Sequence, residues 1–158
     1  MVTLALIRHA KSEWDDPSLS DHDRPLNPRG RRDAPRMAAL VAARAWRPEL
    51  ILASTAVRAR TTAAEFAAAL DAPLDLREEL YGASSSTLWS AAANSGASDV
   101  VVVAHDPGIS ILARQLSEEA PLMPTCAVAV FEWHGAAWTE AADRDPDVVH
   151  YDIPRDES

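Results

Sequence analysis

Residues 100–104 read Val-Val-Val-Val-Ala and lead directly into His105, Asp106 and Pro107. An unbroken run of apolar, mostly β-branched residues predicts a strand that is buried on both faces, as strands of parallel sheets are. The Asp-Pro pair predicts that a helix begins there, with Asp106 as its N-cap, and continues to about Leu116. This stretch therefore places a histidine at the carboxyl end of a buried strand.

Apolar runs and helical patterns alternate along the rest of the chain. Apolar runs predict strands at residues 3–7, 50–53, 74–76, 127–133 and 148–151. Helical spacing predicts helices at residues 28–45 and 56–70 and from residues 84–86 to about 96, while the polar residues 11–26 predict a loop. This alternation predicts an α/β fold, a three-layer sandwich in which helices cover both faces of a mainly parallel sheet.

Side chains at the predicted helix starts suggest how the helices are capped. Asn27 before Pro28 is expected to be an N-cap followed by proline at the first helical position. Ser54 or Thr55 is expected to cap the helix at residues 56–70. Pro35 is expected to kink the helix that follows Pro28 or to shorten its first turn.

Length and composition indicate a folded, soluble protein. The 158 residues suggest one domain over residues 1–158, with the last few residues frayed, and 47% hydrophobic residues suffice for a core. No apolar run approaches the roughly 20 residues that a membrane span needs. The apolar N-terminus predicts a strand rather than a signal peptide. The single cysteine, Cys126, fits a reducing compartment, and we expect a cytoplasmic protein.

The formal net charge of −9 argues against nucleic acid as a partner. However, eleven Lys and Arg residues lie between Arg8 and Arg60, which suggests a local cationic pocket for a small anionic group. Taken singly, most of these arginines are better explained as solvated residues of helix faces. The histidines and the cysteine show no zinc-ligand spacing, so we expect neither a metal ion nor a cofactor.

The carboxyl ends of parallel strands meet at one edge of a sheet, where sites form. Arg8 and His9 follow the first predicted strand, Arg58 lies just beyond the second, and His105 follows the strand at 100–104. Arginine binds phosphoryl oxygens with a planar fork, and a neutral histidine can attack phosphorus, while a second histidine, if protonated, would add a charge. Taken alone, a histidine or an arginine at these positions could be structural. However, the positive charge of Arg58 in the first turn of a helix is opposed by the helix dipole, and this conflict favours an anion held nearby.

Four segments, taken in chain order, resemble the histidine phosphatase superfamily, whose members include phosphoglycerate mutases and phosphohistidine phosphatases. The segments are Leu6-Ile7-Arg8-His9-Ala10-Lys11-Ser12, then Arg24-Pro25-Leu26-Asn27 with Gly30, then Ser54-Thr55-Ala56-Val57-Arg58-Ala59-Arg60-Thr61, and Val103-Ala104-His105-Asp106-Pro107-Gly108. The short chain and the Arg-Pro-Leu segment look most like the compact phosphohistidine phosphatase branch. The resemblance implies a phosphoglycerate-mutase-like fold and a phosphatase that needs no metal ion.

The resemblance also implies roles for the matching residues. His9 is expected to attack phosphorus and become a phosphohistidine, which water then hydrolyses. Arg8 and Arg58 are expected to bind phosphoryl oxygens, and Arg24 to add a further contact. His105 is expected to complete the pocket and stabilise charge in the transition state. Lys11 is expected to lie outside direct contact with the phosphate.

The general acid is left open by the resemblance. Glu78 and Glu79 lie in the region where larger members carry a glutamate, and Asp106 follows the second histidine, as in another branch. Without a strong acid, the labile P–N bond of phosphohistidine would be easier to cleave than a phosphoester bond.

Three functions follow. The first is hydrolysis of phosphohistidine on a partner protein such as a histidine phosphotransfer domain. The second is hydrolysis of a small phosphorylated metabolite, such as a sugar or nucleotide phosphate. The third is a non-catalytic adaptor that binds phosphate. Mutase activity is disfavoured because a chain this short has little from which to build a lid.

Overall fold

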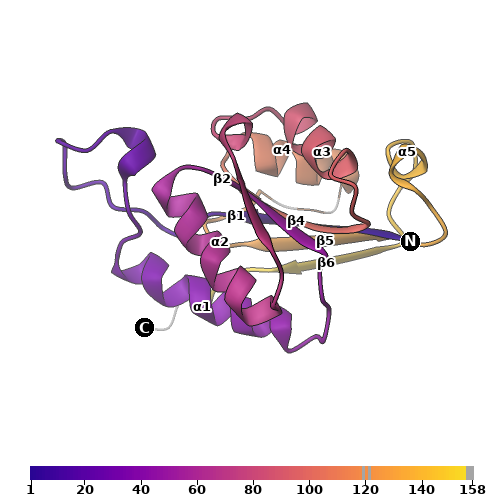
Figure 1. Cartoon of the computed structure of the whole chain (residues 1–158), viewed down its shortest axis with the longest axis horizontal. Coiled ribbons are helices and arrows are strands. Elements are labelled where there is room, and N and C mark those ends of the chain that lie inside the picture. The colour runs from indigo at the N-terminus through magenta and orange to yellow at the C-terminus, as the bar shows by residue number, and fades with distance from the viewer. Residues whose placement is uncertain (119, 121, 156–158) are drawn as a thin grey trace.

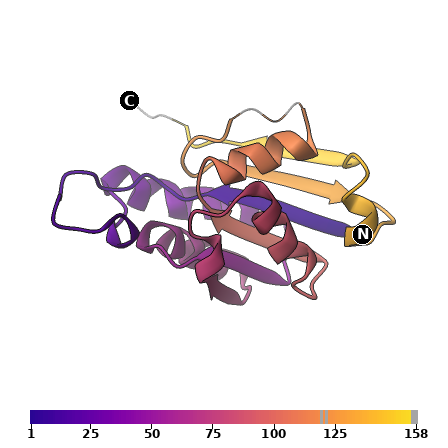
Figure 2. The ribbon, with the colours of Figure 1, turned by 90° about the horizontal axis from the view of Figure 1, so that it is seen from above.

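The computed structural model, which describes residues 1–118, 120 and 122–155, contains one six-stranded sheet with helices on both faces (Figures 1 and 2). The strands lie in the order β3-β2-β4-β1-β5-β6. Their bounds are β1 (Val2–Arg8), β2 (Leu50–Ser54), β3 (Leu74–Arg77), β4 (Asp99–Ala104), β5 (Val128–Trp133) and β6 (Val148–Asp152). The predicted α/β fold is confirmed, while the predicted fraying of the last residues falls on 156–158, outside the described residues.

Strand direction decides which chain segments meet at the edge of the sheet. β1, β4, β2 and β3 pair in parallel, so their carboxyl ends lie at the same edge. β5 runs antiparallel to β1, with Val128 opposite Ile7. The segment that precedes β5 therefore also reaches this edge, beside the residues that follow β1.

The helices cover the two faces in separate groups (Figure 1). One face carries α1 (Pro28–Ala42) and α2 (Val57–Leu70), and the other carries α3 (Ser85–Ala93), α4 (Gly108–Leu116) and the short α5 (Trp138–Ala141). Successive residues of a strand point to opposite faces. Accordingly, Leu4 and Leu6 pack on the side of α3 and α4, while Ala5 and Ile7 pack on the side of α1 and α2.

The helix starts confirm one predicted cap and contradict two others. The Asn27 side chain accepts a hydrogen bond from the backbone N–H of Gly30, as predicted. The N-cap of α2 is Ala56, not Ser54 or Thr55, and α4 begins at Gly108 without a side-chain cap from Asp106. The side chains of Ser54 and Asp106 are instead engaged by other side chains at the sheet edge, as described below.

The helix α1 passes through Pro35 without a break, so the predicted shortening of its first turn is wrong. Its first turn lies against the start of the 11–26 loop: a Cβ atom on Gly30 would lie 2.1 Å from the carbonyl oxygen of Lys11. Only glycine permits this close approach.

The 11–26 loop is closed at its base and projects beyond the sheet (Figures 1 and 2). Ser12 and Leu26 form an isolated bridge, and the Asn27 N–H donates to the Lys11 carbonyl oxygen over 3.0 Å. The loop contains a three-residue 3-10 turn, η1 (Asp21–Asp23), and a second such turn, η2 (Glu78–Leu80), follows β3. The closed base directs η1 back towards the sheet edge, where it contacts Arg58.

Among the described residues, we find no helix with the length and apolar character that crossing a membrane requires.

Candidate active site

A cavity of about 280 Å³ lies at the carboxyl edge of the parallel strands. It collects six of the residues that the sequence singled out, which come from four separate parts of the chain: Arg8, His9, Arg24, Arg58, His105 and Asp106. Lys11, which we expected to lie outside direct contact with a phosphate, also lines the cavity. Asp21, Trp14 and Thr125 line it as well and were not predicted.

His9 lies at the end of β1 with 7% of its surface exposed. Its Nδ1 atom is 2.7 Å from the carbonyl oxygen of Ala10, and because a carbonyl oxygen can only accept, Nδ1 carries the proton. Burial, together with the nearby guanidinium groups of Arg58 and Arg8, lowers the pKa of His9 to about 4. The ring is therefore neutral near pH 7, and its Nε2 atom has a free electron pair.

His105 faces His9, with the two ring centroids 5.0 Å apart. Its Nε2 atom shares a hydrogen bond of 2.7 Å with the hydroxyl of Ser54, at the end of β2. Burial lowers the pKa of His105 to about 3, with further contributions from His9 and Arg58. At neutral pH His105 is thus neutral and contributes a hydrogen bond rather than the positive charge that a protonated ring would add.

Arg24 and Arg58 reach the cavity from the loop and from the first turn of α2, and both side chains are more than nine-tenths buried. The Arg24 guanidinium also lies over the ring of Trp14, 3.5 Å from its centroid. Asp21 holds both arginines: its Oδ1 is 3.2 Å from Arg24 Nη2, and its Oδ2 is 3.0 Å from Arg58 Nη2. Nothing in the polar loop sequence indicated this carboxylate.

Arg8, at the end of β1, is held by two acceptors. Its Nη1 atom donates to the carbonyl oxygen of Met123 over 3.0 Å and lies 3.4 Å from Asp106 Oδ2. The other carboxylate oxygen of Asp106 accepts a hydrogen bond of 2.6 Å from the hydroxyl of Ser110. Both oxygens of Asp106 thus face hydrogen-bond donors.

Thr62 on α2 links the loop after β1 to the start of α2. Its hydroxyl accepts from the Ala10 N–H at 3.0 Å and donates to the Arg58 carbonyl oxygen at 2.8 Å. Sequence reasoning missed it, although Thr62 stands four residues after Arg58 and therefore shares a helix face with it.

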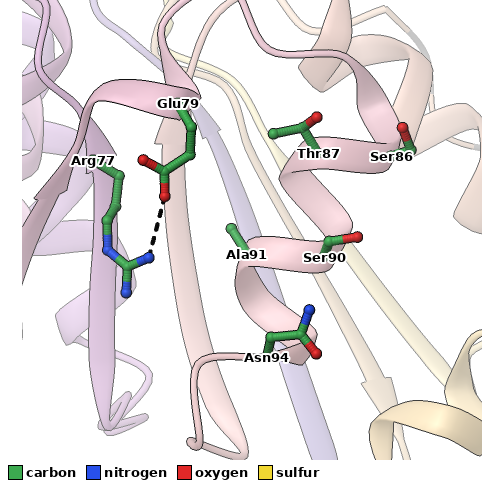
Figure 3. A pocket seen from close by; sticks show the side chains of 7 residues that line it. All are labelled: Arg77, Glu79, Ser86, Thr87, Ser90, Ala91 and Asn94. Atoms are coloured by element: carbon green, nitrogen blue, oxygen red, sulfur yellow. Dashed lines mark hydrogen bonds and ion pairs between the residues drawn. The ribbon is translucent and has the colours of Figure 1, made fainter.

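Glu78 and Glu79, two of the three candidate acids, do not line the cavity that holds His9. Figure 3 shows the Glu79 side chain directed towards Arg77, beside it in the wall of a separate groove next to α3. The Glu79 carboxylate lies 3.2 Å from Arg77 Nη1, which helps to hold its pKa below the ordinary value, after the larger effect of its own backbone N–H. Of the candidates, Asp106 alone lies in the cavity, among the described residues.

The cavity combines a neutral nucleophile with buried cations. Among the described residues, four buried nitrogen atoms without a hydrogen-bond partner belong to it: Nε of Arg8, Arg24 and Arg58, and Nδ1 of His105. The three arginine Nε–H groups are buried donors without acceptors, which costs free energy, so this arrangement suits an anion with several oxygens. The described residues contain no group of histidine, cysteine and acidic side chains that could hold a metal ion.

Solved structures confirm the fold. A protein from Agrobacterium tumefaciens assigned as the phosphohistidine phosphatase SixA is 33% identical and superposes with a TM-score of 0.78, over 84% of this chain and 92% of its own. The corresponding SixA assignment from Nakamurella multipartitia is 28% identical with a TM-score of 0.77, over 97% and 96%. A protein histidine phosphatase SixA complexed with tungstate, at 23% identity and a TM-score of 0.75 over 96% and 94%, shares the fold.

Sequence comparison gives the family. An uncharacterised protein of Mycobacterium tuberculosis is 33% identical over 94% of this chain and 100% of its own length. An uncharacterised Arabidopsis thaliana protein, named as chloroplastic, is 32% identical over 87% of this chain and 69% of its own. The model of the histidine phosphatase superfamily (branch 1) matches residues 4–84. The chain therefore belongs to branch 1 of the histidine phosphatase superfamily and is a phosphatase of that family.

Proposed function

We propose that the protein hydrolyses phosphohistidine on a partner protein, through a phosphohistidine formed on its own His9. The observation that carries this proposal is the His9 tautomer. Because Nδ1–H donates to Ala10, the unprotonated Nε2 is left for attack on phosphorus, in a cavity that also contains Arg8, Arg58 and His105. A non-catalytic adaptor has no need of a nucleophile prepared in this way.

The reaction has two steps. His9 Nε2 attacks phosphorus, and the bond from phosphorus to the substrate imidazole breaks, leaving its electron pair on that nitrogen, which takes up a proton from solvent. Water then attacks phosphorus and releases a proton to solvent, the bond to His9 Nε2 breaks with its electron pair returning to that nitrogen, and inorganic phosphate leaves. In both steps negative charge lies on the phosphoryl oxygens, where the guanidinium groups of Arg8, Arg24 and Arg58 stabilise it.

The contacts of the Asp106 carboxylate favour phosphohistidine over a phosphoester as the substrate. One oxygen accepts a hydrogen bond from Ser110 and the other faces Arg8. The carboxylate is therefore arranged to accept hydrogen bonds rather than to donate a proton. An alkoxide leaving group needs a proton from a general acid, which contributes about 10²- to 10⁴-fold. An imidazole leaving group needs this help much less, because its P–N bond is labile.

The partner we propose is a phosphorylated protein. The names of two related structures support this, because the SixA proteins of Agrobacterium tumefaciens and Nakamurella multipartitia are assigned as phosphohistidine phosphatases. A histidine phosphotransfer domain is one such partner. A cytoplasmic location remains a prediction from sequence, based on the single cysteine, Cys126.

The test compares substrates. We expect the purified full chain to release phosphate from a phosphohistidine-bearing phosphotransfer domain much faster than from a sugar phosphate, a nucleotide or an aryl phosphate. His9→Ala should reduce release to background, and acid quenching should not preserve phosphate on wild-type His9, whereas alkaline quenching should. If only the small esters are hydrolysed, the protein substrate is wrong; if His9→Ala retains full turnover, the mechanism is wrong.

A further inference from the structure

The carboxylate of Asp21 lies between the two arginines that come from outside the strand ends. Its two oxygens are 3.2 Å from Arg24 Nη2 and 3.0 Å from Arg58 Nη2, and the hydroxyl of Tyr81 donates to the second oxygen. This is how an anionic substrate group with two oxygens would bridge the same guanidinium groups. The chain thus provides its own anion to the arginines expected to bind the phosphoryl group.

The exposed fractions of the side chains distinguish Arg24 and Arg58, which the fold encloses, from Asp21, which can be displaced. The Arg24 and Arg58 side chains are 9% and 7% exposed, while the Asp21 side chain is 52% exposed. Asp21 also belongs to η1, a three-residue turn in the projecting loop. The carboxylate therefore borders solvent and has room to turn away from the arginines, whereas the arginines are enclosed by the fold.

The backbone of Asp21 has a separate role. Its carbonyl oxygen accepts a 2.6 Å hydrogen bond from Arg58 Nη1. This bond does not depend on the side chain, so removal of the carboxylate charge leaves one anchor for Arg58 in place. The Tyr81 hydroxyl, and after it the Arg58 guanidinium, hold the pKa of Asp21 below its usual value, so the carboxylate is charged at neutral pH.

We infer that Asp21 is an internal competitor of phosphate, which limits the affinity of the site for phosphoryl oxygens and so favours release of the product. The inference rests on the proposed function, since it concerns the same phosphate site. A phosphoryl dianion that binds Arg24 and Arg58 through their Nη2 donors competes with Asp21 for them, and it repels a carboxylate that stays nearby. The carboxylate must give way when phosphate binds and can return when phosphate leaves.

A positioning role for Asp21 predicts the opposite sign. If the carboxylate mainly oriented Arg24 and Arg58 for phosphate, its loss would weaken phosphate binding. If it competes, its loss strengthens binding. The direction of the change in phosphate affinity therefore separates the two roles.

Asp23 offers a matched control in the same turn. Its carboxylate lies 3.5 Å from His22 Nδ1, and its side chain is 63% exposed. Asp23→Asn removes the same charge from η1 as Asp21→Asn, without removing a contact to Arg24 or Arg58. Comparison of the two variants separates the direct contact from the change in net charge.

The experiment titrates inorganic phosphate into the full chain by calorimetry, and measures product inhibition by phosphate during turnover. We expect Asp21→Asn and Asp21→Ala to lower both the Kd and the inhibition constant about 3- to 10-fold, and Asp23→Asn to change them less than about twofold. Equal or weaker binding by both Asp21 variants would overturn the inference, as would equal tightening by Asp23→Asn. If the wild type neither binds phosphate nor hydrolyses any phosphorylated substrate, the proposed function itself fails.

Discussion

His9 and His105 have the same imidazole ring but different hydrogen-bond partners, and these partners give the two rings different roles in the proposed mechanism. His9 donates from Nδ1 to a backbone carbonyl, which leaves Nε2 unprotonated. His105 uses its Nε2 to bond Ser54, so this nitrogen is occupied. At the scale of the residue, a hydrogen bond to one ring nitrogen decides which nitrogen of His9 is left for attack in the proposed mechanism.

Nuclear magnetic resonance of the ring nitrogens tests this assignment in the free protein. We expect His9 to remain neutral, with the proton on Nδ1, from pH 8 down to pH 5, because burial lowers its pKa to about 4. A titration of His9 near its ordinary pKa of about 6.5, or a proton on Nε2 at pH 7, would contradict the assignment. The spectrum of His9→Asn identifies the signals.

Ser110 is a positioning residue that sequence reasoning did not find. Its buried hydroxyl donates to Asp106 over 2.6 Å and accepts from the Met123 N–H over 3.0 Å. Both of these neighbours face Arg8: the Asp106 carboxylate pairs with its guanidinium, and the Met123 carbonyl oxygen accepts from it. One hydroxyl therefore holds both partners of Arg8, which we propose binds phosphate.

Ser110→Ala should lower kcat/KM about 3- to 10-fold and the free energy of unfolding by about 1–3 kcal/mol, because the buried Met123 N–H loses its acceptor. Ser95→Ala is the control: it also removes two hydrogen bonds, to Ala92 and Ala97, away from the cavity. Steady-state kinetics and urea unfolding of both variants give the comparison. Unchanged kinetics for Ser110→Ala would show that Arg8 does not depend on it.

At the scale of the element, the helix α2 does more than cover the sheet. Its second residue, Arg58, enters the cavity, and one turn later Thr62 hydrogen bonds to the loop after β1. That loop includes the Ala10 carbonyl oxygen that sets the His9 tautomer. The helix thus links the loop beside His9, the proposed nucleophile, to Arg58, a proposed phosphate-binding residue.

Adjacent threonines of α2 allow a matched test of this link. Thr62→Val keeps the shape but leaves the buried Ala10 N–H without an acceptor, so we expect a loss of about 1–3 kcal/mol in stability and at least a threefold lower kcat. Thr61→Val removes an exposed hydrogen bond to Val57 and should change both by little. Equal effects of the two substitutions on kcat would argue against the link.

At the scale of the whole molecule, burial of two neutral histidines links stability to pH. Their pKa values are about 4 and about 3 in the folded protein, below the value of about 6.5 in an unfolded chain. Between these values the unfolded chain binds more protons than the folded protein. The free energy of unfolding must therefore fall as the pH is lowered from about 6.5.

We expect each histidine to cost roughly 1–2 kcal/mol of stability at pH 5 relative to pH 7.5. Urea unfolding at both pH values measures the loss, and the double variant His9→Asn, His105→Asn should show a loss smaller by the sum of the two contributions, roughly 2–4 kcal/mol. His150→Asn, at an exposed histidine, is the control and should retain the full loss. Identical losses in the double variant and the wild type would contradict the lowered pKa values.

The fold was predictable because its signals are local. Apolar runs such as residues 100–104 and the Asn27-Pro28 helix start appear in the structure as a strand and a capped helix. The predictions that failed concern side chains with a choice of partner. Ser54 and Asp106 are good capping residues by type, yet Ser54 bonds to His105, which the sheet brings beside it, and Asp106 bonds to Ser110, one turn along α4.

The sequence by itself determined the order of strands and helices along the chain. It also determined that Arg8, His9, Arg58 and His105 lie at strand and helix ends, because hydrophobic periodicity and chain direction are properties of neighbouring residues. Only the tertiary structure decided which nitrogen of His9 is free, and that Asp21 contacts Arg24 and Arg58 from the loop. The His9 tautomer depends on burial and on the backbone conformation at Ala10, and the pairing of Asp21 with Arg58 depends on groups distant in the chain. These are set when the chain folds, and no local pattern records them.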